Sequence, residues 1–111
     1  MTDERTRKIA ELNDLCRTAM GVGGRLVQTP GIAALPLADQ SAIREKVERF
    51  RAFTEDNDPH GERDFGAFEH NGERIFWKID YYDRDLQFRS PDPADESVTT
   101  RVLTVLLAEE Y

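Results

Sequence analysis

The segment NDPHGERDFG at residues 57–66 concentrates side chains that could bind a metal ion or transfer a proton. It holds one histidine, three carboxylates and two glycines. Carboxylate oxygens suit calcium or magnesium, and a histidine among carboxylates suits manganese, iron or zinc. The same residue types also dominate turns for backbone reasons. We therefore favour a turn-rich loop on an acidic surface, and we keep a ligand cluster as the second interpretation.

The sequence after this loop predicts a β-hairpin with a two-residue Asn71-Gly72 turn, the pattern of a type I′ turn. This turn sets the strand register, so that the numbers of paired residues add up to 143, as 71 and 72 do. Glu69 then lies opposite Arg74, a favourable cross-strand charge pair. Gly66 lies opposite Trp77, where the absent side chain leaves room for the indole ring.

Alternation along the hairpin separates two faces of the sheet. The face expected in the core carries Phe68, Ile75, Trp77, Ile79 and Tyr81. The other face is mixed and carries Phe65, Ala67, Glu69, Arg74, Phe76, Lys78 and Asp80. We expect this second face to be partly covered.

The register brings the 57–66 loop and a second acidic segment to the open end of the hairpin. His60 falls near Asp83, and Glu62 falls near Tyr81. The predicted binding patch consists of His60, Glu62, Asp64, Asp80, Asp83 and Asp85. The candidate metal ligands are Asp56, Asp58, His60, Glu62 and Asp83. We predict no cofactor. A divalent metal ion is the kind of ligand that these residue types could bind.

The spacing tests two specific kinds of site. An EF-hand loop counted from Asp56 puts Gly61 at the glycine position, but the twelfth position is Ala67, where a bidentate Glu is required. An EF-hand is therefore excluded. For catalysis, no Ser or Cys stands in a nucleophile context, and a carboxylate pair such as Glu62 with Asp83 stays open. No catalytic residue is assigned, and the balance favours a protein without enzymatic activity.

Helical spacing of apolar residues predicts a first helix over residues 3–20. Thr2 is its expected N-cap, and Gly21 is its expected end. The GVGG stretch at 21–24 follows this helix. Because phosphate-binding glycine loops lie between a strand and a helix, we interpret GVGG as a flexible turn.

The remaining periodicity predicts a short strand at 25–29, a second helix at 36–53 and a further antiparallel strand at 86–90. Residues 95–109 predict a third helix, with a final strand as the alternative because of their β-branched content. The predicted fold is a single α+β domain over residues 1–111. It has two N-terminal helices, a small antiparallel sheet centred on the Asn-Gly hairpin and a C-terminal helix.

The charge of the chain is asymmetric. Residues 1–55 carry nine Lys or Arg and eight Asp or Glu, whereas residues 56–111 carry six and fourteen, so the halves contribute +1 and −8 to the net charge of −7. Direct nucleic-acid binding is not expected, because phosphate binding needs a basic face. No apolar run approaches the ~20 residues of a membrane span, and the N-terminus lacks the apolar stretch of a signal peptide. With the single cysteine, Cys16, these features predict a cytoplasmic protein.

Three stretches together resemble a bacterial family known as domain of unknown function 3768. They are FTEDNDPHGERDFGAFE, FWKIDYYDRDLQFRSPDPAD and TRVLTVLLAEEY, and the similarity extends over about residues 5–111. The resemblance implies a short protein of plasmids and integrated mobile elements, often encoded near antirestriction and plasmid-maintenance genes. It implies no activity, cofactor or catalytic residue.

Two functional hypotheses remain. The first is a non-enzymatic interaction protein whose acidic surface imitates the phosphates of DNA and binds a basic DNA-processing or defence protein. The second is a small metal-binding domain or metal-dependent enzyme with a His and carboxylate cluster at the open end of the hairpin. The sequence does not determine the oligomeric state.

Overall fold

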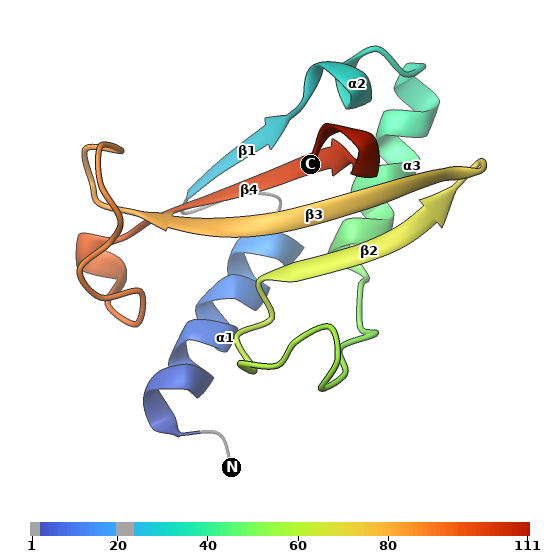
Figure 1. Cartoon of the computed structure of the whole chain (residues 1–111). Helices are drawn as coiled ribbons and strands as arrows, with labels where there is room; N and C mark the ends of the chain where they lie inside the picture. The colour runs from blue at the N-terminus through green and yellow to red at the C-terminus, as the bar shows by residue number, and fades with distance from the viewer. Residues whose placement is uncertain (1–2, 20–23) are drawn as a thin grey trace.

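The computed structural model describes residues 3–19 and 24–111 of the chain. These residues form a four-stranded sheet. Its strands, in spatial order, are β1 (Gly24–Gln28), β4 (Thr100–Leu107), β3 (Glu73–Tyr82) and β2 (Phe65–His70). Helices α1 (Glu4–Thr18) and α3 (Leu37–Glu48) lie on one side of the sheet, and the C-terminal turn, a 3₁₀ helix at Ala108–Glu110, lies on the other (Figure 1). The short helix α2 (Pro30–Ala33) lies between β1 and α3. Among the described residues, no helix has both the length and the apolar character needed to cross a membrane.

Helix α1 lies where its apolar spacing predicts it. Asp3 is the N-cap, and its side chain accepts a hydrogen bond of 2.7 Å from the backbone N–H of Thr6. The buried apolar stripe of the helix contains Ile9, Leu12 and Cys16. The predicted cap Thr2 and the predicted end at Gly21, with most of the GVGG turn, lie outside the described residues.

The second predicted helix, 36–53, is confirmed in place but ends at Glu48. The chain continues as an irregular segment in which Phe50 is still buried. Phe53 packs edge-on against Trp77, with 6.0 Å between the ring centroids. The helical spacing of apolar residues therefore identified core residues correctly, although Phe50 and Phe53 lie beyond the end of the helix. Helix α2 was not predicted.

The Asn71-Gly72 hairpin is confirmed, with β2 (Phe65–His70) paired to β3 (Glu73–Tyr82) in the predicted register. Both turn residues adopt positive φ angles, 50° and 80°, as a type I′ turn requires. Gly66 lies opposite Trp77, and a Cβ atom on this glycine would overlap the indole ring. The missing side chain is therefore what allows Trp77 to be buried at this position.

The predicted C-terminal helix is wrong. Residues Thr100–Leu107 form strand β4, which pairs antiparallel with β3 and parallel with β1 (Gly24–Gln28). Burial in this segment alternates with a period of two, and Arg101, Leu103 and Val105 are the buried positions at its centre. Its β-branched residues suit a central strand with partners on both sides, and these partners outweigh the helical spacing. The alternative, a final strand, is correct.

The predicted third antiparallel strand at 86–90 is also wrong. An isolated bridge joins Tyr82 to Arg89, and β4 occupies the place beside β3. The sheet is mixed rather than antiparallel, because β1 and β4 run parallel. The chain between β3 and β4 forms a long connection that extends past the end of the sheet (orange, at the left in Figure 1).

The core lies between the sheet and the helices. Its buried members are Cys16, Ile32, Ile43, Val47, Phe50, Ile75, Trp77, Ile79, Leu103 and Val105. The predicted core-face residues of the hairpin are all in this core or packed against it. On the opposite face of the sheet, Phe65 and Phe76 pack edge-on against Tyr111. This second face is therefore partly covered, as predicted.

Candidate functional site

The residues of the predicted patch take part in four local arrangements, of which the first is a hydrogen-bonded network around Glu62. The Tyr81 hydroxyl donates a bond of 2.8 Å to Glu62 Oε1. Asn13 of α1 is completely buried, and its Nδ2 donates to the Tyr81 hydroxyl at 2.7 Å and to the Glu62 carbonyl at 2.9 Å. Arg101 Nε donates to Asn13 Oδ1 at 2.7 Å. Burial raises the pKa of Tyr81, so its hydroxyl stays a donor, and Glu62 fastens the loop to α1 and the sheet.

The second arrangement contains Asp64 and Asp80, which line a pocket of about 290 Å³ where β3 ends. Lys78 Nζ lies 2.9 Å from Asp80 Oδ2. Burial raises the pKa of the Asp64 carboxyl, and neighbouring carboxylates add to this shift. Lys78 already supplies a counter-charge here, so the pair of carboxylates is not free to hold a cation by itself.

The third arrangement contains Asp58 and His60, which line an open pocket of about 570 Å³ beside the start of α1. Asp58 Oδ1 accepts a hydrogen bond of 3.1 Å from the backbone N–H of Arg63. Gly61 and Arg63 have φ angles of 71° and 57°, so this bond closes a tight left-handed turn. Asp56 is exposed in the same loop. The Asp58 carboxylate therefore stabilises the backbone of the loop to which it belongs.

The fourth arrangement is the turn at residues 82–90, which carries Asp83 and Asp85. The Asp83 N–H donates to the Phe88 carbonyl at 2.8 Å, and Asp83 Oδ1 accepts from the N–H of Gln87 at 3.0 Å. Asp85 is exposed. No group of three or more His, Cys, Asp and Glu side chains in the described parts of the chain is arranged to hold a metal ion. That finding covers the candidate ligands Asp56, Asp58, His60, Glu62 and Asp83.

The 82–90 turn also exposes two large hydrophobic side chains. Phe88 is 72% exposed and Leu86 is 36% exposed. Leu86 has a φ angle of 60°, a left-handed conformation that costs an L side chain about 1 kcal/mol. The N–H of Leu86 donates to the Asp83 carbonyl at 3.1 Å, and the N–H of Ser90 donates to the Tyr81 carbonyl at 3.0 Å. Backbone hydrogen bonds therefore hold the turn closed while its apolar side chains face solvent.

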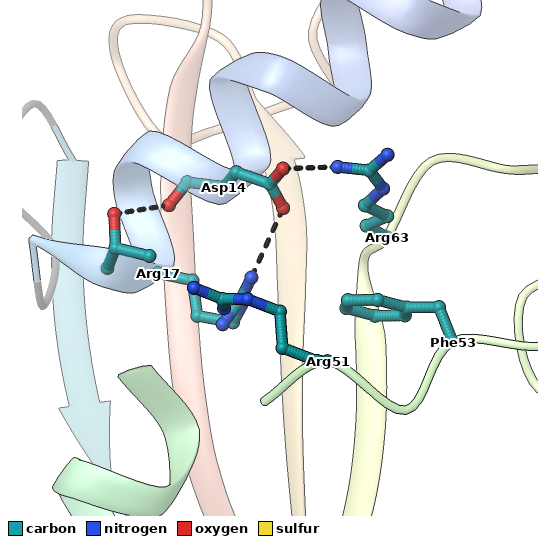
Figure 2. A pocket seen from close by; sticks show the side chains of 6 residues that line it. Asp14, Arg17, Arg51, Phe53 and Arg63 are labelled. Carbon is teal, nitrogen blue, oxygen red and sulfur yellow. Dashed lines mark hydrogen bonds and ion pairs between the residues drawn. The ribbon is translucent and has the colours of Figure 1, made fainter. Parts of the chain in front are cut away.

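A pocket that the sequence did not indicate lies between α1 and the loop that follows α3 (Figure 2). It has a volume of about 470 Å³ and is lined by Asp14, Arg17, Thr18, Arg51, Phe53 and Arg63. Figure 2 shows Asp14 between the guanidinium groups of Arg17 and Arg63. These residues come from α1 and from two parts of the connection between α3 and β2. No local spacing links them, so only the folded chain reveals the pocket.

A family model with the description "Protein of unknown function (DUF3768)" matches residues 28–110 of the chain. The match begins at the end of β1 and includes the 57–66 loop, the hairpin and β4. Helix α1, which supplies Asn13 and Arg17, lies outside it. No curated protein and no solved structure shows significant similarity to the chain.

Proposed function

Since the chain belongs to the DUF3768 family, whose description names no activity, we propose a function from its own geometry. We propose that it is a small non-enzymatic binding protein that docks on a protein partner through the 82–90 turn. The observation that supports this most directly is the exposed Phe88 side chain on a turn closed by its own hydrogen bonds.

Preorganisation of the turn supports this proposal. A segment that is already closed loses little conformational entropy on binding. Leu86 holds a left-handed conformation, and such strained residues are found preferentially at functional sites. Aromatic side chains are frequent hot spots of interfaces, because they bury a large area with few rotatable bonds. Phe88 and Leu86 are therefore the side chains that we expect a partner to enclose.

The charge beside the turn indicates the kind of partner. Asp85 is exposed next to Leu86, and the second half of the chain carries fourteen acidic against six basic side chains. An apolar pocket rimmed by Lys or Arg would complement this surface, and opposite charges would speed the encounter. A basic DNA-processing or defence protein fits this description. Because Glu62, Asp80 and Asp83 are already bonded within the chain, the proposal depends on the turn and not on a free array of carboxylates.

A photo-crosslinking residue placed at position 88 tests whether the turn contacts a partner in cells. The matched control is position 37, because Leu37 is 80% exposed at the start of α3. We expect position 88 to form a discrete crosslink to a basic protein that position 37 does not form. The same products from both positions would contradict the proposal.

Phe88→Ala is expected to weaken binding of that purified partner by about tenfold or more, since truncating an interface hot spot costs ~2 kcal/mol. Leu37→Ala should leave the affinity within about twofold of the wild type. Asp85→Asn should mainly slow association, and the effect should fade at high salt. Surface plasmon resonance measures the affinity and both rates. Equal affinity of the wild type and Phe88→Ala would rule out the turn as the docking element.

A further inference from the structure

We propose that the pocket between α1 and the loop after α3 is a binding site for a phosphate monoester, separate from the 82–90 turn. The described residues that line it carry three guanidinium groups, those of Arg17, Arg51 and Arg63, and one carboxylate, that of Asp14. The pocket therefore has an excess of two positive charges. This excess opposes the net charge of the whole chain, which is −7.

Arg17 is the fixed part of the pocket. Its Nη1 donates to the carbonyls of Val47 and Glu48, each at 2.9 Å, and its Nη2 lies 3.2 Å from Asp14 Oδ1. The guanidinium carbon lies 5.3 Å from the centroid of the Trp77 ring. The buried Nε has no hydrogen-bond partner among the described residues. These contacts hold a permanent positive charge in one position and orient Asp14.

Arg51 and Arg63 are the adjustable part, because both side chains are exposed. Arg51 donates one hydrogen bond of 3.1 Å to the carbonyl of the preceding residue, and Arg63 is paired with Asp14 through Nη1. Figure 2 shows Arg51 beside Arg17, and Arg63 on the same side as the Phe53 ring. A guanidinium group has five N–H donors, so these single contacts leave donors for a ligand.

The charge of the pocket favours an oxyanion with two negative charges, and among these we assign a phosphate monoester. Such a group carries about −1.5 to −2 charges at neutral pH, which matches the excess of two positive charges. A carboxylate carries one charge and would leave half of the excess uncompensated. One guanidinium group can donate two parallel N–H hydrogen bonds to two oxygens of a phosphate, which favours Arg over Lys at such a site. The volume of about 470 Å³ exceeds that of an oxyanion, so the carrier of the phosphate can rest against Phe53.

Titration of the full chain with inorganic phosphate, followed by ¹H–¹⁵N NMR at constant ionic strength, tests the site. We expect saturable shifts at residues 14–18 and 51–53, and an affinity at least about tenfold weaker in Arg51→Gln. The matched control is Arg49→Gln, which removes the same charge from an exposed side chain paired with Glu45 outside the pocket. It should bind phosphate as the wild type does. Shifts that do not saturate, or equal losses in both variants, would overturn the proposal.

The variant Asp14→Asn tests the site in a way that a folding defect cannot imitate. It removes the carboxylate from the pocket but keeps an oxygen that can accept hydrogen bonds from Arg17 and Arg63. The affinity for phosphate should rise by about threefold or more, because the repulsion between Asp14 and the ligand is removed. Partial unfolding cannot produce a gain in affinity. An unchanged or lower affinity in a folded Asp14→Asn protein would count against the proposal.

Different anions at equal ionic strength identify the ligand class. Phosphoserine and a nucleoside 5′-monophosphate should bind at least as tightly as phosphate, and the tighter of the two shows whether the carrier is an amino acid or a nucleotide. Phosphate gains its second charge within the range of about pH 5.5 to 7.5, so its binding should strengthen there, whereas binding of sulfate should stay constant. Acetate should bind about tenfold more weakly than phosphate. Equal affinity for acetate would replace the phosphate assignment with a carboxylate site.

Discussion

Two arginines, Arg17 and Arg101, are buried almost completely, at 1% and 4% exposure. The guanidinium carbon of Arg101 lies 5.1 Å from the centroid of the Tyr81 ring, and its Nε bonds to Asn13. Burial lowers the pKa of both arginines, but an ordinary value above ~12 leaves them charged at neutral pH. Backbone carbonyls and aromatic rings therefore solvate these two charges in place of water. Single polar side chains such as Asn13 join elements that share no sequence motif.

The ionisation of a single residue, Asp64, makes the stability of the protein depend on pH. Burial raises the pKa of the Asp64 carboxyl above the ordinary value for an aspartate, and neighbouring carboxylates shift it in the same direction. The folded form therefore binds this proton more tightly than the unfolded form, and the ionised group opposes folding as the pH rises above about 4. Asp64→Asn should raise the urea midpoint at pH 7 and change it little at pH 3.

The control for this prediction is Asp56→Asn in the exposed part of the same loop. It should leave the urea midpoint nearly unchanged at both pH values. If Asp64→Asn stabilised the protein as much at pH 3 as at pH 7, the gain would come from packing or hydrogen bonding and not from the charge.

Among the elements, α3 ends where Arg17 reaches its last carbonyls. The final turn of a helix leaves carbonyl groups without intrahelical partners. Arg17 donates to the carbonyls of Val47 and Glu48, and the Val47 carbonyl also accepts a backbone bond of 3.3 Å from Phe50. The chain can then leave the helix, and Phe53 packs edge-on against Trp77 from an irregular segment. A residue of α1 thus helps to cap the end of α3.

Arg17→Met is expected to lower the free energy of unfolding by about 2 kcal/mol, because the Glu48 carbonyl loses its Arg17 donor and the Val47 carbonyl and Asp14 each lose one of two partners. Urea unfolding measures this loss, and amide hydrogen exchange should speed up in the last turn of α3 more than in β3. Arg7→Met, at an exposed position of the same helix, should change the stability by less than about 0.5 kcal/mol. Similar losses in both variants would show that the bonds to α3 contribute little.

The hairpin is determined by residues close together in the sequence, whereas β4 is determined by contacts with distant segments. The dihedral angles of Asn71-Gly72 set the turn, and the register of β2 and β3 follows from it. Strand β4 instead pairs with β1, near the other end of the chain. Its apolar residues satisfy helical and strand spacing alike, so its partners decide between the two structures.

In the whole molecule, the sheet has a core face and a second face that the C-terminal turn partly covers. The ring of Tyr111 lies 5.5 Å from that of Phe76 and 6.3 Å from that of Phe65, measured between centroids. The three rings shield one another from water on the side that carries no long helix (Figure 1). Tyr111 therefore limits the apolar area that this face offers for self-association.

Tyr111→Ala is expected to lower the free energy of unfolding by about 1 kcal/mol, the value of a lost aromatic pair. It should also promote self-association at high concentration, because Phe65 and Phe76 become more exposed. Urea unfolding and sedimentation velocity measure the two effects. Tyr111→Phe keeps the ring and should behave as the wild type. An unchanged stability and no self-association in Tyr111→Ala would show that the rings are independent.

The sequence by itself determined the features whose causes lie within a few residues. These are the hairpin turn and its register, the apolar stripe of α1, the position of α3 and the turn-forming 57–66 loop. Only the tertiary structure decided that residues 100–107 form a strand, that carboxylates of the predicted patch are bonded within the chain, and that Arg17, Arg51 and Arg63 meet at one pocket. Backbone dihedral preferences and side-chain periods act locally, so a sequence records them directly. The free energy of contacts between distant segments appears only when the chain brings those segments together.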